Sequence, residues 1–550
     1  IDAEKLRVCF EPNPTIADPE QNDWRPKWVQ AQNDVRFHSE QLDGETDQLL
    51  VRFEYPRVPA SRADANGVRP VSTFPYRVTS EGEHSVSTVA NGSRSEFARQ
   101  ATSVGRGQVG GNRLPSSNTN AAPWQLFLAG DELDITVRVL SPGPSELVRV
   151  DVTGNASLDR IDAGAQTEPF RLNAQRFTLT NATSTGGVFT AFGQPARIRF
   201  QDMQVAGNQM EVDRNRNLIR INGAGAMDMT GTPQLGKSSS RTRAQPNNGD
   251  LANEKTHIQW RDGFVFDGRV ARVEGKVTLE NSKEQIRADR VNIHLKNPID
   301  LGQTDANAKA EVDNVLAEGS VCAEHRIIED NDLRTVAIFM CPSFQLNQQT
   351  GDFLAMGDGL VMAWRKGFQA GSALGAQGQS KEDPDRISFV QIEFGRQGTG
   401  NVNQRSVTFD QQVRLTYGPV RKFYDRIRPG LPLTDDDVIL MCDQMTLMQV
   451  ASNASGGMAV DARARGNTTI RGAWFKATGE RASYDQSKGL FVLEGEGQTP
   501  ARVEAQKRSS RTSTETVGQK ILVWPATKEV ELDDVRFLDL RTFSRLGAGR

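Results

Sequence analysis

The fold is decided by the stretch Ala271-Arg272-Val273-Glu274-Gly275-Lys276-Val277-Thr278-Leu279. Its small and apolar residues recur at every second position, and charged or hydroxyl side chains stand between them. This period of two is typical of a half-buried β-strand, because successive side chains of a strand point to opposite faces. The same alternation recurs at 196–201, 291–295 and 501–506, and helical spacing of similar quality is hard to find. We therefore predict an all-β chain.

Short glycine-centred phrases recur along the chain: Val152-Thr153-Gly154-Asn155-Ala156, Val273-Glu274-Gly275-Lys276-Val277, Ala317-Glu318-Gly319-Ser320-Val321, Ala464-Arg465-Gly466-Asn467-Thr468 and Leu493-Glu494-Gly495-Glu496-Gly497. A glycine inside a strand suggests a bend or a close backbone approach. Self-similarity of this loose kind favours stacked strand units over a single closed sandwich.

The composition supports an elongated structure with a thin core, because only 37% of the 550 residues are hydrophobic and 7% are aromatic. Basic and acidic residues are interspersed and the net charge is −3, so the electrostatic footprint of a dedicated nucleic-acid binder is missing. No apolar run approaches the roughly 18–20 residues of a membrane-spanning helix.

Polar tracts rich in Ser, Gly, Asn and Arg divide the chain. We expect an N-terminal tail at 1–23, a first strand unit at 24–57, a flexible insertion at 58–122, a strand segment at 123–229, a linker at 230–253, a second strand segment at 254–365, a linker at 366–385, a C-terminal strand segment at 386–541 and a tail at 542–550. These segments are expected to be consecutive parts of one extended structure.

Four cysteines are present, and no Cys-x-x-Cys spacing supports a structural zinc site. Two strand-like runs flank the turn-prone residues 329–332. If Asn331 and Asp332 form a two-residue hairpin loop, Cys322 and Cys341 lie directly opposite each other, within reach of a disulfide. The sequence leaves open whether they form this bridge, which indicates an oxidising compartment, or stay two small buried thiols.

Residues 231–238 match the phosphate-binding P-loop pattern, and residues 105–110 match the Gly-x-Gly-x-x-Gly pattern. Both chemistries require a preceding strand and a following helix, whereas both matches lie in polar tracts, so we interpret them as coincidences. The five histidines show no metal-ligand spacing, and no pair of carboxylates stands out as an acid/base couple. We therefore expect no enzyme activity, no metal and no cofactor.

Two groups of strand phrases suggest a family. Residues 267–279 followed by 287–293, and residues 466–470 followed by 475–485 and 490–495, resemble the OstA-like, or LptA-type, repeat of lipopolysaccharide-transport proteins. In that repeat a Gly-x-Val strand is followed by a strand with Ala, then Asp or Arg, then a hydrophobic residue. The phrases Gly193-Gln194-Pro195-Ala196-Arg197-Ile198 and Gln498-Thr499-Pro500-Ala501-Arg502-Val503 look like two copies of one strand start.

The resemblance implies an open β-jellyroll, in which two sheets form a V-shaped groove that holds acyl chains, and units that stack end to end across the periplasm. The candidate groove residues are Val273, Val277, Leu279, Val291, Ile293 and Leu295. The alternative for each of them is an ordinary core position. The implied partners are lipopolysaccharide or a related glycolipid, and other envelope transport proteins or a second copy paired through edge strands.

We expect a non-enzymatic protein of envelope biogenesis, located in the periplasm or cell envelope of a bacterium. Because the chain opens with Ile1, we expect it to be processed or truncated, which leaves room for a membrane anchor ahead of it. One alternative is a structural scaffold with the same fold, whose groove is filled by its own side chains and which acts only through edge pairing. Another is a parallel β-helix enzyme acting on polysaccharide.

Overall fold

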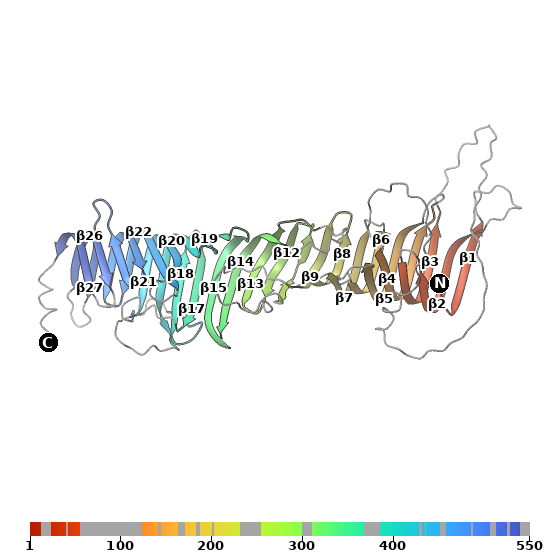
Figure 1. Ribbon diagram of the computed structural model, residues 1–550, viewed down its shortest axis with the longest axis horizontal. Coiled ribbons are helices and arrows are strands. Elements are labelled where there is room, and N and C mark those ends of the chain that lie inside the picture. Colours follow the sequence, from red (N-terminus) through yellow and green to blue (C-terminus); the bar gives the residue numbers. More distant parts are fainter. Residues whose placement is uncertain are drawn as a thin grey trace, which may run out of the picture.

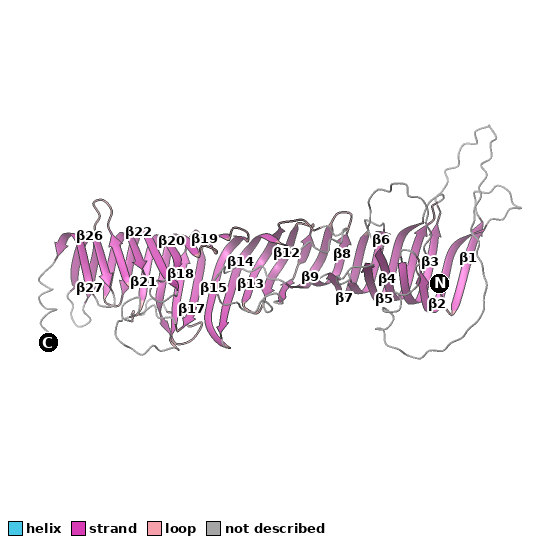
Figure 2. Ribbon diagram, viewed as in Figure 1, coloured by secondary structure: helices cyan, strands magenta, loops and turns pink. Residues whose placement is uncertain are grey.

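The structure is a computed structural model of residues 1–550. It describes residues 1–12, 24–39, 42–55, 124–140, 145–162, 171–182, 187–200, 203–230, 255–299, 311–329, 331–367, 385–427, 432–434, 436–451, 458–485, 488–506, 513–524 and 529–538. These residues form strands, turns and bends, without a helix (Figure 2). The prediction of an all-β chain is confirmed.

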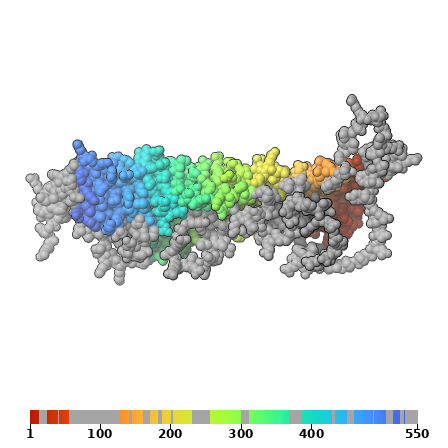
Figure 3. Space-filling model, turned by 45° about the horizontal axis from the view of Figure 1, so that its top comes forward, coloured from red at the N-terminus to blue at the C-terminus, as the bar shows by residue number. Residues whose placement is uncertain are grey.

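The strands follow one another from one end of an elongated body to the other (Figures 1 and 3). They are β1 (Lys5–Pro12), β2 (Trp24–His38), β3 (Leu42–Glu54), β4 (Trp124–Arg138), β5 (Glu146–Asp162), β6 (Arg171–Ala182), β7 (Val188–Phe200), β8 (Met203–Asp213), β9 (Leu218–Thr230), β10 (Lys255–Trp260), β11 (Gly263–Phe266), β12 (Val270–Glu280), β13 (Glu284–Leu295), β14 (Val312–Glu329), β15 (Asp332–Asn347), β16 (Asp352–Met356), β17 (Gly359–Lys366), β18 (Ile387–Phe394), β19 (Gln397–Asn401), β20 (Ser406–Val420), β21 (Val438–Ala451), β22 (Met458–Gly472), β23 (Phe475–Asp485), β24 (Leu490–Glu494), β25 (Ala501–Gln506), β26 (Ser513–Trp524) and β27 (Glu529–Leu538).

All these strands belong to one hydrogen-bonded sheet, in which β3 and β4 pair parallel and the other described pairs are antiparallel. Eight of the short strands form four interrupted strands, each made of two consecutive halves. The two halves of each pair with the same neighbour: β10 and β11 with β9, β16 and β17 with β15, β18 and β19 with β20, and β24 and β25 with β26. This antiparallel ladder excludes the coils of a parallel β-helix.

A line of irregularities runs across the sheet. Between β4 and β23, each strand either shifts its register near its middle or is interrupted there. We call this line the crease. The sheet half that contains residues 270–274 of β12 is the first arm, and the half that contains residues 277–280 is the second arm. A bulge bends its strand and increases the local twist, so a row of bulges folds the sheet lengthwise.

The predicted bends at the glycine phrases are confirmed at the crease. Gly275 has a φ of +86° and lies at the register shift between β12 and β13. A Cβ atom on Gly275 would lie only 2.3 Å from Cγ of Asp262, so the bulge requires glycine for its backbone conformation and for this close approach. Gly154, Gly319 and Gly466 repeat the arrangement against an aspartate of the neighbouring strand.

The two arms pack their inner faces against each other. One cluster of buried apolar residues extends from Ala31 in β2 to Val523 in β26 and includes residues of both arms. Three aromatic pairs join the arms across the crease: Trp260 with Phe264 at 5.3 Å between ring centroids, Phe339 with Phe344 at 5.6 Å, and Phe394 with Phe409 at 5.2 Å. The core is therefore thin and long, in line with the low apolar content.

The expected alignment of Cys322 with Cys341 is wrong. Cys322 pairs with Met340 and Cys341 pairs with Val321, because Glu329 pairs with Asp332 and the register shifts between Ile327 and Ile328. A register change of one residue turns a side chain to the opposite face of the sheet. Cys341 is buried, Cys322 is half-buried, and both thiols are free.

The expected N-terminal tail at 1–23 contains a strand. Leu6 pairs with Ala31 and Val8 with Val29, so β1 continues the inner face of the first arm. The expected insertion 58–122 and tail 542–550 lie outside the described residues, as do both nucleotide-motif matches. The expected linkers 230–253 and 366–385 also lie outside them, except for Thr230, Lys366, Gly367 and Asp385.

Candidate functional site

The six candidate groove residues all lie in the interior between the arms. Val273 pairs directly with Val291 at the crease end of the first arm, and Ile293 pairs with Ala271. Val277 and Leu279 come from the second arm, so the six side chains approach the interior from both sides. Their exposed fractions lie between 0% and 7%. The structure brings together all six predicted residues, as buried members of the apolar cluster.

The alternation that predicted these strands also explains their polar outer face. Between the inward residues stand Arg272 and Glu274, and these make ion pairs with Asp267 at 3.1 Å and Arg290 at 3.2 Å. All four side chains are a third or more exposed, so each pair contributes only about 0–1 kcal/mol. The stability of these strands therefore rests on the interior, where a fully buried Val, Leu or Ile contributes roughly 1.5–3 kcal/mol.

Three hydrogen-bonding groups in the interior have no partner among the described residues. They are Oγ1 of Thr256, Nε1 of Trp260 and the hydroxyl of Tyr484. Thr256 and Trp260 are 3% and 4% exposed and lie on the inner face of β10, on either side of Ile258. Leaving a buried donor unsatisfied costs about 1–3 kcal/mol. The interior therefore offers hydrogen bonds that the described protein does not use.

Sequence reasoning missed these interior polar groups, although the signal was present. Thr256, Ile258 and Trp260 occupy alternate positions of one short run, which places all three on the inner face. Burial also raises the pKa of the Tyr484 hydroxyl. It raises the pKa values of the interior thiols of Cys341 and Cys442 to about 12, so both thiols stay neutral at ordinary pH.

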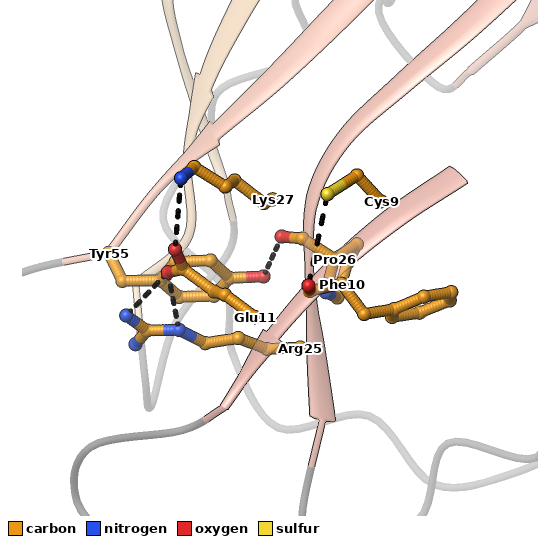
Figure 4. A network of polar contacts seen from close by, with 7 residues as sticks. All are labelled: Cys9, Phe10, Glu11, Arg25, Pro26, Lys27 and Tyr55. Atoms are coloured by element: carbon orange, nitrogen blue, oxygen red, sulfur yellow. Dashed lines mark hydrogen bonds and ion pairs between the residues drawn. The ribbon is translucent and has the colours of Figure 1, made fainter. Parts of the chain in front are cut away.

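At its N-terminal end the inner face is exposed. Leu6, Val8 and Phe10 on β1 are 54%, 40% and 52% exposed. Beside them, a polar network fixes β1 to β2 (Figure 4): Arg25 contacts Glu11 at 2.8 Å, its guanidinium lies 4.0 Å from the ring centre of Tyr55, and the Tyr55 hydroxyl donates to the carbonyl oxygen of Pro26 at 2.8 Å. This end thus presents apolar side chains to solvent beside the polar contacts that join β1 to β2.

Within the part of the chain that the structure describes, no group of three or more His, Cys, Asp or Glu side chains is arranged to hold a metal ion. The described residues also lack a helix with the length and apolar composition that a membrane span requires.

Comparisons with models of protein families, with curated proteins and with solved structures find no match for this sequence. The resemblance to OstA-like repeats therefore rests on the sequence phrases alone. In each of its two groups of phrases, one glycine, Gly275 or Gly466, bends a strand at the crease.

Proposed function

We propose that this chain binds and conducts an amphipathic lipid of the lipopolysaccharide type through its interior, without a chemical step, as part of a bacterial envelope. The observation that carries the proposal is the single apolar cluster that runs from Ala31 to Val523 between two arms joined by a crease. An interior that is apolar over the whole body suits a ligand that is itself long and apolar.

The interior near the crease is filled by the protein's own side chains, so a lipid must separate the arms. That separation costs little hydrophobic free energy, because acyl chains replace one apolar neighbour by another. Meanwhile each CH₂ group that leaves water contributes about 0.8 kcal/mol. The bulged crease is the natural place for the arms to hinge, since its residues are the least constrained by ladder hydrogen bonds.

The unused interior donors support a lipid over a plain hydrocarbon. The ester and hydroxyl oxygens near the head of a glycolipid's acyl chains are acceptors, and Thr256, Trp260 and Tyr484 offer donors without described partners. Satisfying each of them recovers part of the cost of its burial. A purely structural interior gains nothing from these groups.

The exposed inner face of β1 supports the proposed continuation of the path into another protein. Leu6, Val8 and Phe10 lie on the same face as Ala31 and the rest of the interior. Other envelope proteins, or a second copy, are the proposed neighbours. A periplasmic location fits this proposal, because the path would then join two membranes.

The second candidate is the scaffold, which acts only by edge pairing. The three aromatic pairs across the crease favour it, because they fill the space that a lipid would need. Native mass spectrometry of the protein purified from its own envelope separates the two functions. Glycolipid bound in stoichiometric amount supports the conduit, whereas an empty protein that assembles through its ends supports the scaffold.

A further inference from the structure

The one parallel contact of the described sheet divides it into two pieces. β1, β2 and β3 are antiparallel neighbours, and the strands from β4 onward, which we call the main sheet, are antiparallel among themselves. β3 runs parallel to β4, in register from Leu42 opposite Leu126 to Glu54 opposite Arg138. A parallel pair cannot be joined by a hairpin, so β3 and β4 meet as two sheet edges. We call residues 1–55, at the N-terminal end of the molecule, the module (Figure 1).

The module is joined to itself by its own polar contacts. Tyr55, the residue after β3, donates its hydroxyl to the carbonyl oxygen of Pro26 in β2. Arg25 of β2 contacts both the ring of Tyr55 and the carboxylate of Glu11 in β1 (Figure 4). These contacts link all three strands of the module and fix its last residue to β2. The module therefore holds the contacts of a unit that can leave the main sheet as one piece.

The fit between the module and β4 is close on the inner face. Leu49 of β3 pairs with Leu133 of β4, and both are buried in the apolar cluster. Gly44 pairs with Leu128, and a Cβ atom on Gly44 would lie 2.5 Å from the carbonyl oxygen of Leu128. A strand with a side chain at that point cannot approach β4 as closely. At such a sheet edge, backbone hydrogen bonds supply affinity and alternate side chains supply specificity.

On the outer face, β4 presents a carboxylate that the module neutralises. Asp134 of β4 lies directly opposite Asp151 of β5, and like charges in directly opposite positions destabilise a sheet. Arg149 of β5 contacts Asp151 at 2.9 Å. Asp134 makes its ion pair with Arg52 of the module at 2.8 Å, and its other carboxylate oxygen is buried without a hydrogen-bond partner among the described residues. The edge of β4 therefore favours a neighbouring strand that brings a cation beside Asp134.

The module of a second copy offers the same fit. The described contacts across the junction lie in or next to β3 and β4, and exchange of an identical element between copies keeps every one of them. Within one chain, the connection through residues 55–123 supplies the module at an effective concentration of about millimolar order. The single chain is therefore the main form in dilute solution, and exchange increases as copies are concentrated.

We propose that the edge of β4 is an acceptor for the module of a second copy, so that copies of this chain join by exchanging residues 1–55. In the exchanged form Gly44 lies against Leu128 and Arg52 against Asp134 of the other copy. The exchange joins the main sheets of the copies at their N-terminal ends. It goes beyond the proposed lipid path and requires no bound lipid.

Disulfide trapping between two full-length variants tests the exchange. Gln48 and Glu132 are exposed partners on β3 and β4, and adjacent strands lie about 5 Å apart, within disulfide range. One variant carries Gln48→Cys and the other Glu132→Cys, both with serine in place of Cys9 and Cys322. The two are mixed at high concentration under mild oxidation, and each disulfide traps an exchange as it occurs. The control mixture combines Glu211→Cys with Arg220→Cys, which are partners within the main sheet.

The expected result is a disulfide between positions 48 and 132 of different copies, with the control mixture uncrosslinked. The double variant Q48C/E132C should form the same disulfide within one chain in dilute solution. Closure of the double variant without any dimer in the mixture overturns the exchange. Equal crosslinking in the two mixtures also overturns it, because the contact is then unspecific. Failure of the double variant to close overturns the junction on which the proposal stands.

Charge reversal tests the contact between Arg52 and Asp134. Arg52→Asp should open the junction, so that hydrogen exchange in peptides from β3 and β4 becomes about tenfold faster. The double variant R52D/D134R reverses the pair and should recover most of the protection. Arg7→Asp makes the same charge change on β1, away from the junction, and should leave β3 and β4 unchanged. Equal effects of Arg52→Asp and Arg7→Asp, or no recovery in the double variant, overturn the role of this pair in recognising the module.

Discussion

Replacing Gly275 by alanine should destabilise the crease locally. The expected loss of free energy is the sum of a backbone cost and a crowding cost. An alanine at a φ of +86° costs roughly 1–2 kcal/mol relative to glycine. Its Cβ atom would also lie 2.3 Å from Cγ and 2.6 Å from the backbone nitrogen of Asp262. That aspartate is fixed, because its amide donates to the carbonyl oxygen of Glu274 and its own carbonyl oxygen accepts from Gly223. Crowding of this kind costs typically about 1–3 kcal/mol, which gives a total of roughly 2–5 kcal/mol.

Gly223 provides the matched control. Its φ is +79°, but a Cβ atom there would meet nothing within 4 Å. Gly223→Ala should therefore carry only the backbone cost of roughly 1–2 kcal/mol. The measurement is hydrogen exchange followed by mass spectrometry, because a long sheet need not unfold in two states, while exchange reports local opening. Peptides from β10 and β12 should lose more protection in Gly275→Ala than in Gly223→Ala, and peptides from β23 should be unchanged in both.

Either of two results would refute this reasoning. Equal losses of protection in the two variants mean that the contact with Asp262 contributes nothing. Full protection in both means that the crease does not depend on its left-handed residues. The double variant G275A/D262A should recover part of the loss, because it removes the side-chain contact but leaves the backbone contact.

The remaining predictions concern the thiols, the segment 421–427, which we call the strap, and the aromatic pairs. In the folded protein at pH 8.5, iodoacetamide should modify Cys9 and Cys322 but not Cys341 or Cys442, whose pKa values burial raises to about 12. The folded state binds the protons of these two thiols more tightly than the unfolded state does, so the free energy of unfolding should fall as the pH rises from about 9 to 12. A urea midpoint that stays constant over that range contradicts this expectation. Trp364→Phe loses the bond to Asp425, worth about 1 kcal/mol, and should accelerate tryptic cleavage within the strap, whereas Trp474→Phe should not. Phe394→Ala leaves Phe409 without its partner and should cost about 3–5 kcal/mol, seen as faster exchange in β18 and β20 with β7 unaffected.

Much of the fold follows from the sequence because its signals are local. Alternation placed Val273, Val291 and Ile293 on one face, and the glycine phrases marked where strands bend. What the sequence does not contain is the alignment of these bends, which depends on the register between strands. The same limit explains the cysteines: one extra residue near Ile327 moved Cys322 to the opposite face from Cys341.

A second buried cluster lies on the outer face of the second arm, and the strap covers it with Phe423 and Ile427. This outer cluster, formed by Val336, Met362, Trp364, Ile387 and Phe389, also escaped the sequence reasoning, for a different reason. Residues 360–364 are apolar at every position, so period-two alternation is absent and the run carries no sign of which face is inner. Such a run indicates a strand buried on both faces, which is what Trp364 and Val361 show on opposite sides of β17. Its cover, the strap, is recognisable only afterwards, from Phe423 and Ile427 in an otherwise basic segment.

The most direct test of the central claim is contact between lipid chains and the interior. Brominated acyl chains quench a tryptophan that they touch, and the chain offers two buried tryptophans in different places: Trp260 in the interior, 4% exposed, and Trp364 in the outer cluster, 0% exposed. Two variants each keep a single tryptophan, either Trp260 or Trp364, with the other tryptophans replaced by phenylalanine. Saturating brominated lipid should quench the fluorescence of Trp260 and leave that of Trp364 unchanged. Unquenched Trp260, or equal quenching of both, would contradict a lipid path between the arms.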